Sequence, residues 1–201
     1  MLILIGDSMK LILASSSKFK REILENVCIK HISVDSKYDE DISDYIDVYD
    51  YVKKLSLGKA NSVINEFNEG IILGLDTVVY VDDKIIEKPN SMDEARNNIY
   101  LCMNNSTKVI TGITLINLYN NEIITDYVES IVKLREISAD DINYYFDNEK
   151  DAMYASGFII ETIMSNFIEN INGSFYNILG MPVETIYKYI NKWGYSLKDF
   201  E

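Results

Sequence analysis

The sequence predicts an α/β fold in which a mixed, twisted sheet is flanked by helices. Short apolar runs alternate with amphipathic segments along its 201 residues, a pattern typical of helices layered on a sheet. Several expected connections between strands are short hairpins, which a purely parallel sheet does not contain. No internal repeat or Pro-rich linker divides the chain. We therefore expect one domain over residues 1–201, with residues 1–9 as an N-terminal extension.

The first half of the chain is expected to alternate strands and helices. A short apolar run precedes a segment whose apolar side chains recur at helical spacing, and an alternating run follows. The elements expected here are a strand at residues 11–14, a helix at 19–27, a strand at 30–35, a loop at 37–50 that becomes helical near Tyr45, and a helix at 51–65.

The second half begins with the strongest strand pattern, at residues 71–81, which is interrupted by the polar pair Asp76-Thr77. The pair Asp82-Asp83 then predicts a hairpin turn. The further elements expected are strands at residues 84–86, 108–118, 123–134 and 165–171, a helix from a Ser91–Glu94 capping box to residue 103, a helix from a Ser138–Asp141 cap to residue 146, and a helix at 183–193.

Composition and charge exclude several classes of function. The net charge of −13 argues against general nucleic-acid binding, which needs a basic face. No apolar run approaches the roughly 18 residues of a membrane span, and the N-terminus lacks the basic start of a signal peptide. We therefore expect a cytoplasmic protein that binds neither nucleic acid nor membrane. Its oligomeric state, including a homodimer, is left open.

Cysteine and histidine usage narrows the chemistry further. Cys28 and Cys102 have no metal-like spacing, and we expect both to be buried thiols of a cytoplasmic protein. His31 is the only histidine, so a Ser-His-Asp triad or a multi-histidine metal site is nearly excluded. We expect His31 to be a structural or solvated strand residue.

Three serines followed by three cations form the most informative stretch of the chain. Serines 15–17 precede Lys18, Lys20 and Arg21, at the expected start of the first helix. Cations are unfavourable there because the helix macrodipole makes that end positive. A bound polyanion would resolve the conflict, since helix N-termini bind phosphate. We expect phosphate binding here, with a divalent cation to neutralise the anion.

Three further residues are candidates for chemistry, and each has a structural alternative. Asp76 interrupts an apolar strand, where a carboxylate is costly unless it is paired, hydrogen-bonded or metal-bound. Its alternative is an aspartate that caps a β-bulge. Lys88 is fixed by the following Pro89 and is otherwise a solvated turn lysine. Lys59 lies near an apolar helical stripe and is otherwise a snorkelling lysine.

Five short motifs occur in a specific order. They are Leu-Ala-Ser-Ser-Ser-Lys-Phe-Lys-Arg-Glu-Ile-Leu at residues 13–24, Leu-Asp-Thr-Val-Val at 75–79, Lys-Pro at 88–89, Val-Ile-Thr-Gly at 109–112 and the segment from Gly173 to Pro182. In this order and spacing they resemble the motifs of the Maf family of nucleotide pyrophosphatases, over about residues 10–193.

The resemblance implies a Maf/ITPase-like fold with two lobes around a nucleotide-binding cleft. It also implies hydrolysis of a nucleoside triphosphate, dTTP or UTP, to the monophosphate and pyrophosphate, with a divalent metal cation, Mg²⁺ or Mn²⁺. By the same resemblance, the catalytic residues are Asp76, as general base or metal-organising carboxylate, Lys88, Lys59 and Glu40; the metal ligands are Asp76 and Glu40. The implied substrate-binding residues are Ser15, Ser17, Phe19, Lys20, Thr77, at a position tied to base choice, and Glu161.

The chain departs from the family at two of these positions. Phe19 replaces the first of two arginines, and arginine grips phosphate in a bidentate way that lysine cannot. Glu161 replaces a glutamine linked to substrate choice. A second hypothesis is therefore kept, a nucleotide-binding protein with weak catalysis that regulates cell division through partners. A third is a phosphatase of another phosphorylated metabolite.

Overall fold

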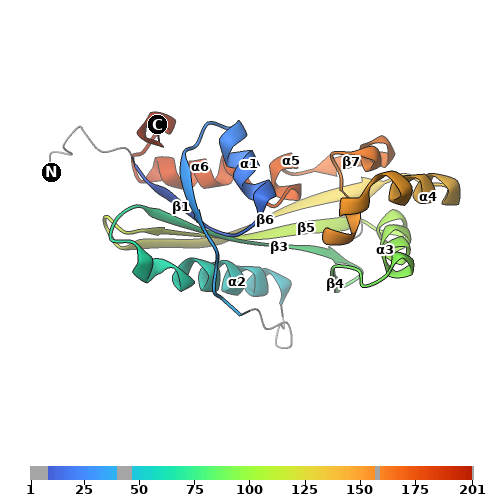
Figure 1. Cartoon of the computed structure of the whole chain (residues 1–201), viewed down its shortest axis with the longest axis horizontal. Coiled ribbons are helices and arrows are strands. Elements are labelled where there is room, and N and C mark those ends of the chain that lie inside the picture. The colour runs from blue at the N-terminus through green and yellow to red at the C-terminus, as the bar shows by residue number, and fades with distance from the viewer. Residues whose placement is uncertain (1–8, 40–46, 157–158, 201) are drawn as a thin grey trace. The chain divides into compact units, whose positions relative to one another are not determined.

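The computed structural model describes residues 9–39, 47–156 and 159–200. Its strands are β1 (Leu11–Ala14), β2 (His31–Val34), β3 (Ile71–Val81), β4 (Lys84–Ile86), β5 (Thr107–Asn117), β6 (Glu122–Leu134) and β7 (Ile168–Asn172). Its α-helices are α1 (Lys18–Asn26), α2 (Val48–Ser62), α3 (Met92–Asn104), α4 (Ala139–Asn148), α5 (Phe175–Ile178) and α6 (Val183–Lys192) (Figure 1).

The strands form one mixed sheet with the order β2-β1-β3-β5-β6-β7, and β4 pairs with β3. Strand β1 pairs in parallel with both β2 and β3. Strand β4 is antiparallel to β3, and β7 is antiparallel to β6. The predicted mixed α/β fold is confirmed, and the predicted cleft between two lobes stays a prediction.

The described residues form two compact units. Unit 1 contains the residues up to 77, residues 111–128 and the residues from 179 onward, and unit 2 contains residues 78–110 and 129–178. In unit 2, α3 and α4 contact each other through Arg96, whose guanidinium lies 5.7 Å from the centre of the Phe146 ring. Arg96 Nη2 also donates to Asn143 Oδ1 at 3.1 Å.

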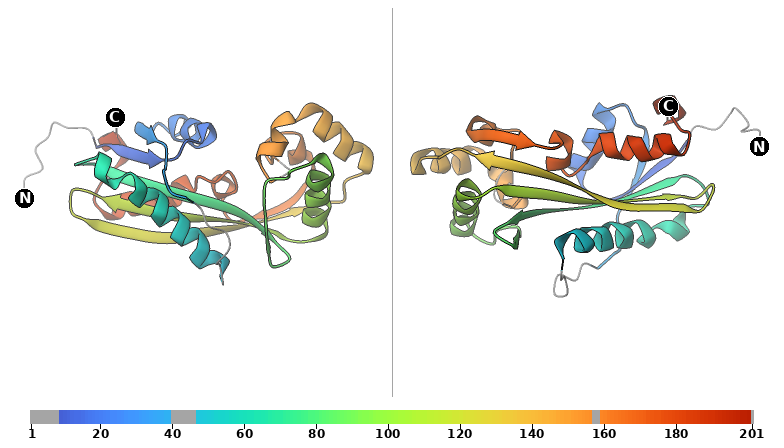
Figure 2. Two further views of the ribbon diagram at one scale, coloured as in Figure 1. Left: turned by 60° about the horizontal axis from the view of Figure 1, so that its bottom comes forward. Right: turned by 180° about the vertical axis from the view of Figure 1, so that it is seen from behind.

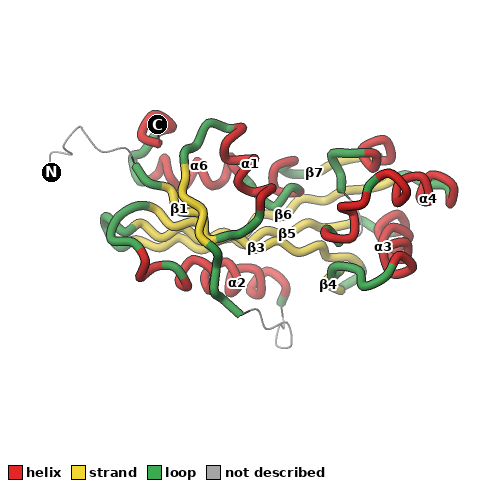
Figure 3. Tube along the Cα trace, in the orientation of Figure 1, coloured by secondary structure: helices red, strands yellow, loops and turns green. Residues whose placement is uncertain are grey.

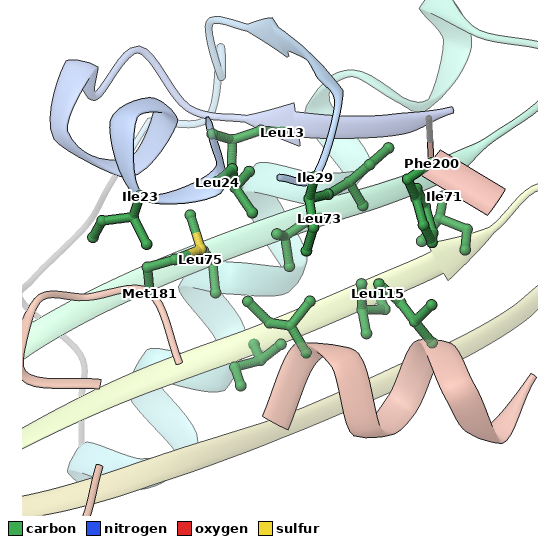
Figure 4. Packing of buried hydrophobic residues seen from close by; sticks show 14 residues of the cluster. Leu13, Ile23, Leu24, Ile29, Ile71, Leu73, Leu75, Leu115, Met181 and Phe200 are labelled. Atoms are coloured by element: carbon green, nitrogen blue, oxygen red, sulfur yellow. The ribbon is translucent and has the colours of Figure 1, made fainter. Parts of the chain in front are cut away.

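Unit 1 has helices on both faces of its strands, with α2 on one face and α1 and α6 on the other (Figures 1 and 2). Alternate side chains of a strand point to opposite faces, so the fully buried β1 supplies both layers. Leu11 and Leu13 join the cluster that includes residues of α1 and α6 (Figure 4). Ile12 and Ala14 join a second cluster with Ala60 of α2. This explains why the run at residues 11–14 is apolar throughout.

Helix α2 lies directly on the strand backbone because two glycines leave room for it. A Cβ atom on Gly74 of β3 would lie 2.2 Å from the carbonyl oxygen of Ser56. A Cβ atom on Gly112 of β5 would lie 2.0 Å from the carbonyl oxygen of Val52. The buried Ser56 hydroxyl also lies 3.0 Å from Thr114 Oγ1 of β5. These contacts fix where α2 sits on the strands.

Most element predictions are confirmed, with boundary differences. Strand β3 spans the expected residues, so it continues through Asp76-Thr77. Figure 3 shows it as a strand beside β5. The expected strand at 165–171 begins later, at Ile168, because Ile163–Phe167 form a 3₁₀ turn. Helix α2 begins earlier than expected, at Val48, because Asp47 caps it by accepting from two backbone N–H groups. The helical turn expected near Tyr45 lies outside the described residues.

The prediction that both cysteines are buried is wrong for Cys28. Cys28 is exposed, in the turn between α1 and β2, and its φ of 58° is in the left-handed region. The next residue, Ile29, occupies the core instead. Cys102 is buried as expected, and burial raises the pKa of its thiol to about 11. His31 is a strand residue, as expected, and its Nδ1 lies 3.1 Å from the Ile29 carbonyl oxygen.

We predict that Gly112→Ala lowers the free energy of unfolding by more than about 2 kcal/mol, because the added methyl group overlaps the α2 backbone. Urea denaturation would measure the loss. Gly194→Ala is the matched control, since a Cβ atom there has no neighbour within 4 Å. Its positive φ of 87° adds about 1 kcal/mol or more of backbone strain, so its loss is the baseline that Gly112→Ala should exceed. Equal losses for the two variants would contradict the close approach of α2.

Candidate active site

The candidate site residues of unit 1 gather where β1 ends and β3 continues. The parallel register of the two strands aligns Leu13 with Leu73, and β1 stops at Ala14. Strand β3 runs on to Val81, so Asp76 and Thr77 lie beyond the end of β1. The carboxyl ends of parallel strands are where α/β proteins commonly bind ligands.

A serine turn connects the end of β1 to α1. Ser17 is the N-cap of the helix, and its hydroxyl accepts from the backbone N–H of Lys20 at 3.3 Å. The N–H of Ser17 in turn donates to Ser15 Oγ at 3.2 Å. The first turn of α1 contains no acidic residue. No carboxylate in the first turn therefore offsets the positive end of the helix dipole. This end of α1 favours binding of an anion.

The side chain of Lys20 reaches from α1 to β3. Its ammonium donates to the carbonyl oxygen of Leu75 at 3.4 Å, and that carbonyl is joined directly to Asp76. Gly180, just before α6, lies against the same side chain. A Cβ atom on Gly180 would be 3.5 Å from Lys20 Cε and 2.9 Å from Thr77 Oγ1. Lys20, Thr77 and the Gly180 backbone therefore form one group of contacts.

Asp76 forms an ion pair with Lys59 of α2. Lys59 Nζ lies 2.6 Å from Asp76 Oδ1, and the two side chains are 16% and 9% exposed. Gly74 determines this pairing, because it lets α2 approach β3 two residues before Asp76 and on the same face. The carboxylate inside the apolar strand is thus paired, and Lys59 is an ion-pair partner, not a snorkelling lysine.

Successive residues of β3 point to opposite faces, so Asp76 and Thr77 contact different elements. Asp76 lies on the α2 face with Ile72, whereas Thr77 lies on the face of Leu73, which packs with α1 and α6. Thr77 Oγ1 is 3.0 Å from Thr111 Oγ1 of β5. Sequence reasoning noted the motif that contains Thr111 but gave this residue no role.

The remaining predicted residues are an exposed phenylalanine of unit 1, two residues of unit 2 and one residue outside the described ranges. Phe19 is 43% exposed on α1. Lys88 and Glu161 belong to unit 2, where both are exposed, and Glu40 lies outside the described residues. Desolvation raises the pKa of the Glu161 carboxyl, and the nearby negative charge of Glu149 adds to the rise.

A hollow of about 850 Å³ in unit 1 lies on another side of α1. It is lined by Arg21, Glu25, Cys28, Ile29, Lys30, His31, Ser33 and Phe200, and by none of the residues clustered around Asp76. Arg21 lines this hollow, whereas its sequence neighbour Lys20 reaches the β3 backbone. Of the three cations at the start of α1, Lys20 is the one that hydrogen-bonds to the backbone of β3.

A divalent metal would find one carboxylate in the described cluster, that of Asp76. Among the residues that the structure describes, no group of three or more His, Cys, Asp or Glu side chains has metal-binding geometry. Mg²⁺ commonly takes only one or two protein carboxylates, and substrate phosphates and water supply the other ligands. The residues present therefore fit a metal that binds together with a phosphate substrate.

Comparison with known proteins identifies the family of this chain. The family model for Maf-like proteins matches residues 10–193. The chain belongs to the Maf family. A dTTP/UTP pyrophosphatase of Clostridium perfringens strain SM101 is 35% identical over 191 residues, which cover 94% of this chain and all of that protein. A dTTP/UTP pyrophosphatase of Clostridioides difficile is 34% identical over 185 residues, covering 92% of this chain and 95% of that protein.

More distant relatives extend the comparison. A dTTP/UTP pyrophosphatase of Methanococcoides burtonii is 30% identical over 191 residues, which cover 94% of this chain and 98% of that protein. Among solved structures, the Ham1 protein of Staphylococcus aureus matches with a TM-score of 0.43 at 11% identity, covering 62% of this chain and 71% of that one. None of the described helices has the length and hydropathy needed to cross a bilayer.

We predict that Lys59→Met lowers the free energy of unfolding by about 3 kcal/mol, because it leaves the buried Asp76 carboxylate without its partner. In the Lys59→Met/Asp76→Asn double variant the loss should be smaller than the sum of the two single losses. Urea denaturation of all four proteins measures this coupling. The control pair Lys133–Glu169 is about half exposed, and its coupling should be below about 0.5 kcal/mol. Similar coupling in both pairs would contradict the burial of the Asp76 pair.

We predict that Glu161→Gln stabilises the protein at pH 7 and has no such effect near pH 4. A carboxyl whose pKa is raised by folding favours the protonated folded state. Its contribution to stability is present below the unfolded pKa and is lost as pH rises through the folded pKa. The gain at pH 7 should be a few tenths of a kcal/mol, roughly, because Glu161 is exposed. Thermal melts at both pH values measure it, and an equal gain at pH 4 would contradict the raised pKa.

Proposed function

We propose that this chain hydrolyses nucleoside triphosphates, with dTTP and UTP preferred, to the nucleoside monophosphate and pyrophosphate in the presence of a divalent metal ion. The observation that carries the proposal is that Lys20 binds the Leu75 carbonyl just past the carboxyl end of β1, directly before the Asp76 that pairs with Lys59. Lys20 and the serine-capped N-terminus of α1 approach β3 from one face and Lys59 from the other, in a chain whose net charge is −13. The names of the Maf relatives support the nucleotide substrate.

Different groups of the chain bind the phosphates, accept the proton and position the proton acceptor. The N-terminus of α1 and the Lys20 ammonium bind phosphate oxygens, because both present donors and positive charge. Asp76 accepts a proton from the attacking water. The water oxygen forms a bond to the α-phosphorus, the bond to the bridging oxygen breaks, and pyrophosphate leaves. Lys59, at 2.6 Å, holds the Asp76 carboxylate in a fixed orientation during this step.

Asp76 is the described residue that would hold the metal, together with oxygens of the substrate. Glu40, the second ligand implied by the family, lies outside the described residues, and its part in the site stays a prediction. When bound, Mg²⁺ or Mn²⁺ would neutralise the charge of the phosphates. In the described part of unit 1, Lys20 contributes to the same neutralisation from the opposite side of β3.

We predict that Asp76→Asn lowers kcat for dTTP by about 10²-fold or more and changes KM by less than about threefold, because the amide cannot take the proton from water. Pyrophosphate release from a panel of nucleoside triphosphates with Mg²⁺ or Mn²⁺ measures both constants. Asp83→Asn is the matched control. Asp83 is exposed in the β3–β4 turn at φ 58°, a conformation that asparagine tolerates.

The same assay separates the alternatives. Folded wild-type protein that releases no pyrophosphate from any nucleotide would overturn the proposal. A nucleotide-induced rise in melting temperature without product would instead support a binding protein with weak catalysis. The exposed Phe19 in place of an arginine is the observation that favours this second candidate. Release of orthophosphate without pyrophosphate would identify a phosphatase.

A further inference from the structure

Thr111 places a buried hydroxyl directly behind an accessible one. Thr111 lies on β5 and is 0% exposed, whereas Thr77 on β3 is partly exposed and follows Asp76 in the chain. Their Oγ1 atoms are 3.0 Å apart, a hydrogen-bonding distance for two hydroxyl groups. Thr111 is therefore too deep to contact a ligand itself, and its hydrogen bond to Thr77 gives it a route by which to affect one.

Packing alone does not determine which way the Thr77 hydroxyl points. The hydroxyl and methyl groups of threonine are similar in size, and rotation about χ1 exchanges their positions among staggered rotamers. Gly180 lies on the other side of Thr77 Oγ1, since a Cβ atom there would be only 2.9 Å away. The glycine leaves room for either group. The hydrogen bond to Thr111 is the contact that distinguishes the hydroxyl from the methyl.

The oriented hydroxyl belongs to the same group of contacts as Lys20. The Cβ atom that would lie 2.9 Å from Thr77 Oγ1 would also lie 3.5 Å from Lys20 Cε. A threonine hydroxyl has one donor and two acceptor positions, so the bond to Thr111 leaves capacity for another partner. A ligand that binds the Lys20 ammonium would meet this hydroxyl next to it.

We propose that Thr111 is a positioning residue that fixes the Thr77 hydroxyl for binding the nucleotide. The proposal rests on the proposed function, because it assumes that the ligand beside Lys20 is a nucleotide. Thr111 acts on binding more than on the chemical step, since Thr77 and the proton-accepting Asp76 point to opposite faces of β3.

The experiment compares Thr111→Val, which removes the hydroxyl and keeps the shape, with Thr111→Ser, which keeps the hydroxyl. Two readouts are used: KM and kcat for dTTP, and Kd for a dTTP analogue with a non-hydrolysable bridge between the α- and β-phosphorus atoms. Thr111→Val should raise KM and Kd about fivefold, the effect of one lost hydrogen bond, and change kcat less than about twofold. Thr111→Ser should retain wild-type values within about twofold.

Two controls separate positioning from general loss of structure. Thr107 is also on β5 and also 0% exposed, so Thr107→Val removes a comparable buried hydroxyl elsewhere on the strand and should leave KM and Kd unchanged. In a Thr77→Val background, Thr111→Val should have no further effect on Kd, because it acts through Thr77.

The outcomes distinguish this inference from the proposed function. Unchanged Kd in Thr111→Val, or additive effects of Thr77→Val and Thr111→Val, would overturn the role of Thr111 even if dTTP is hydrolysed. Absence of hydrolysis by the wild type, with the expected change in Kd, would overturn the proposed reaction and support the role of Thr111. Absence of nucleotide binding by the wild type would overturn both.

Discussion

The ion pair between Lys59 and Asp76 depends on how closely a helix can approach a strand. A lysine on α2 reaches a carboxylate of β3 at 2.6 Å only because Gly74 lets the helix backbone lie against the strand. Gly112 does the same on the neighbouring strand. A larger residue at either position would lift α2 and separate the two charges. An unpaired carboxylate in this apolar setting would then carry the full cost of desolvation.

The shortness of β1 is the second constraint on the site. Four residues bring the chain to the serine turn while β3 continues for several residues more. That difference leaves the edge of β3 beyond Leu73 without a partner from β1. One face presents Asp76 to α2, and the other presents Thr77 to the segment around Gly180. Lys20 contacts β3 at the same point, because its ammonium donates to the Leu75 carbonyl, which is joined directly to Asp76.

The elements and the candidate residues differ in how far the sequence could predict them. Strand β3 and the cap at Ser17 were predictable because apolar runs and serine N-caps are local signals. The partner of Asp76 was not, because nothing local connects a helical lysine to a strand seventeen residues later. Cys28 was mispredicted for the same reason. Its exposure depends on a left-handed turn that composition does not reveal.

The missing arginine changes how phosphate would be held, not whether the place attracts it. Lysine is a compact charge with rotatable donors, and it lacks the planar fork by which arginine fixes two oxygens at once. Orientation must then come from groups that are themselves fixed. In unit 1 these are the backbone N–H groups at the start of α1 and the hydroxyls of β3 and β5. In the proposed function Lys20 would supply the charge, and Thr77, held by the buried Thr111, would supply direction, so loss of the arginine fork would shift specificity toward the strands.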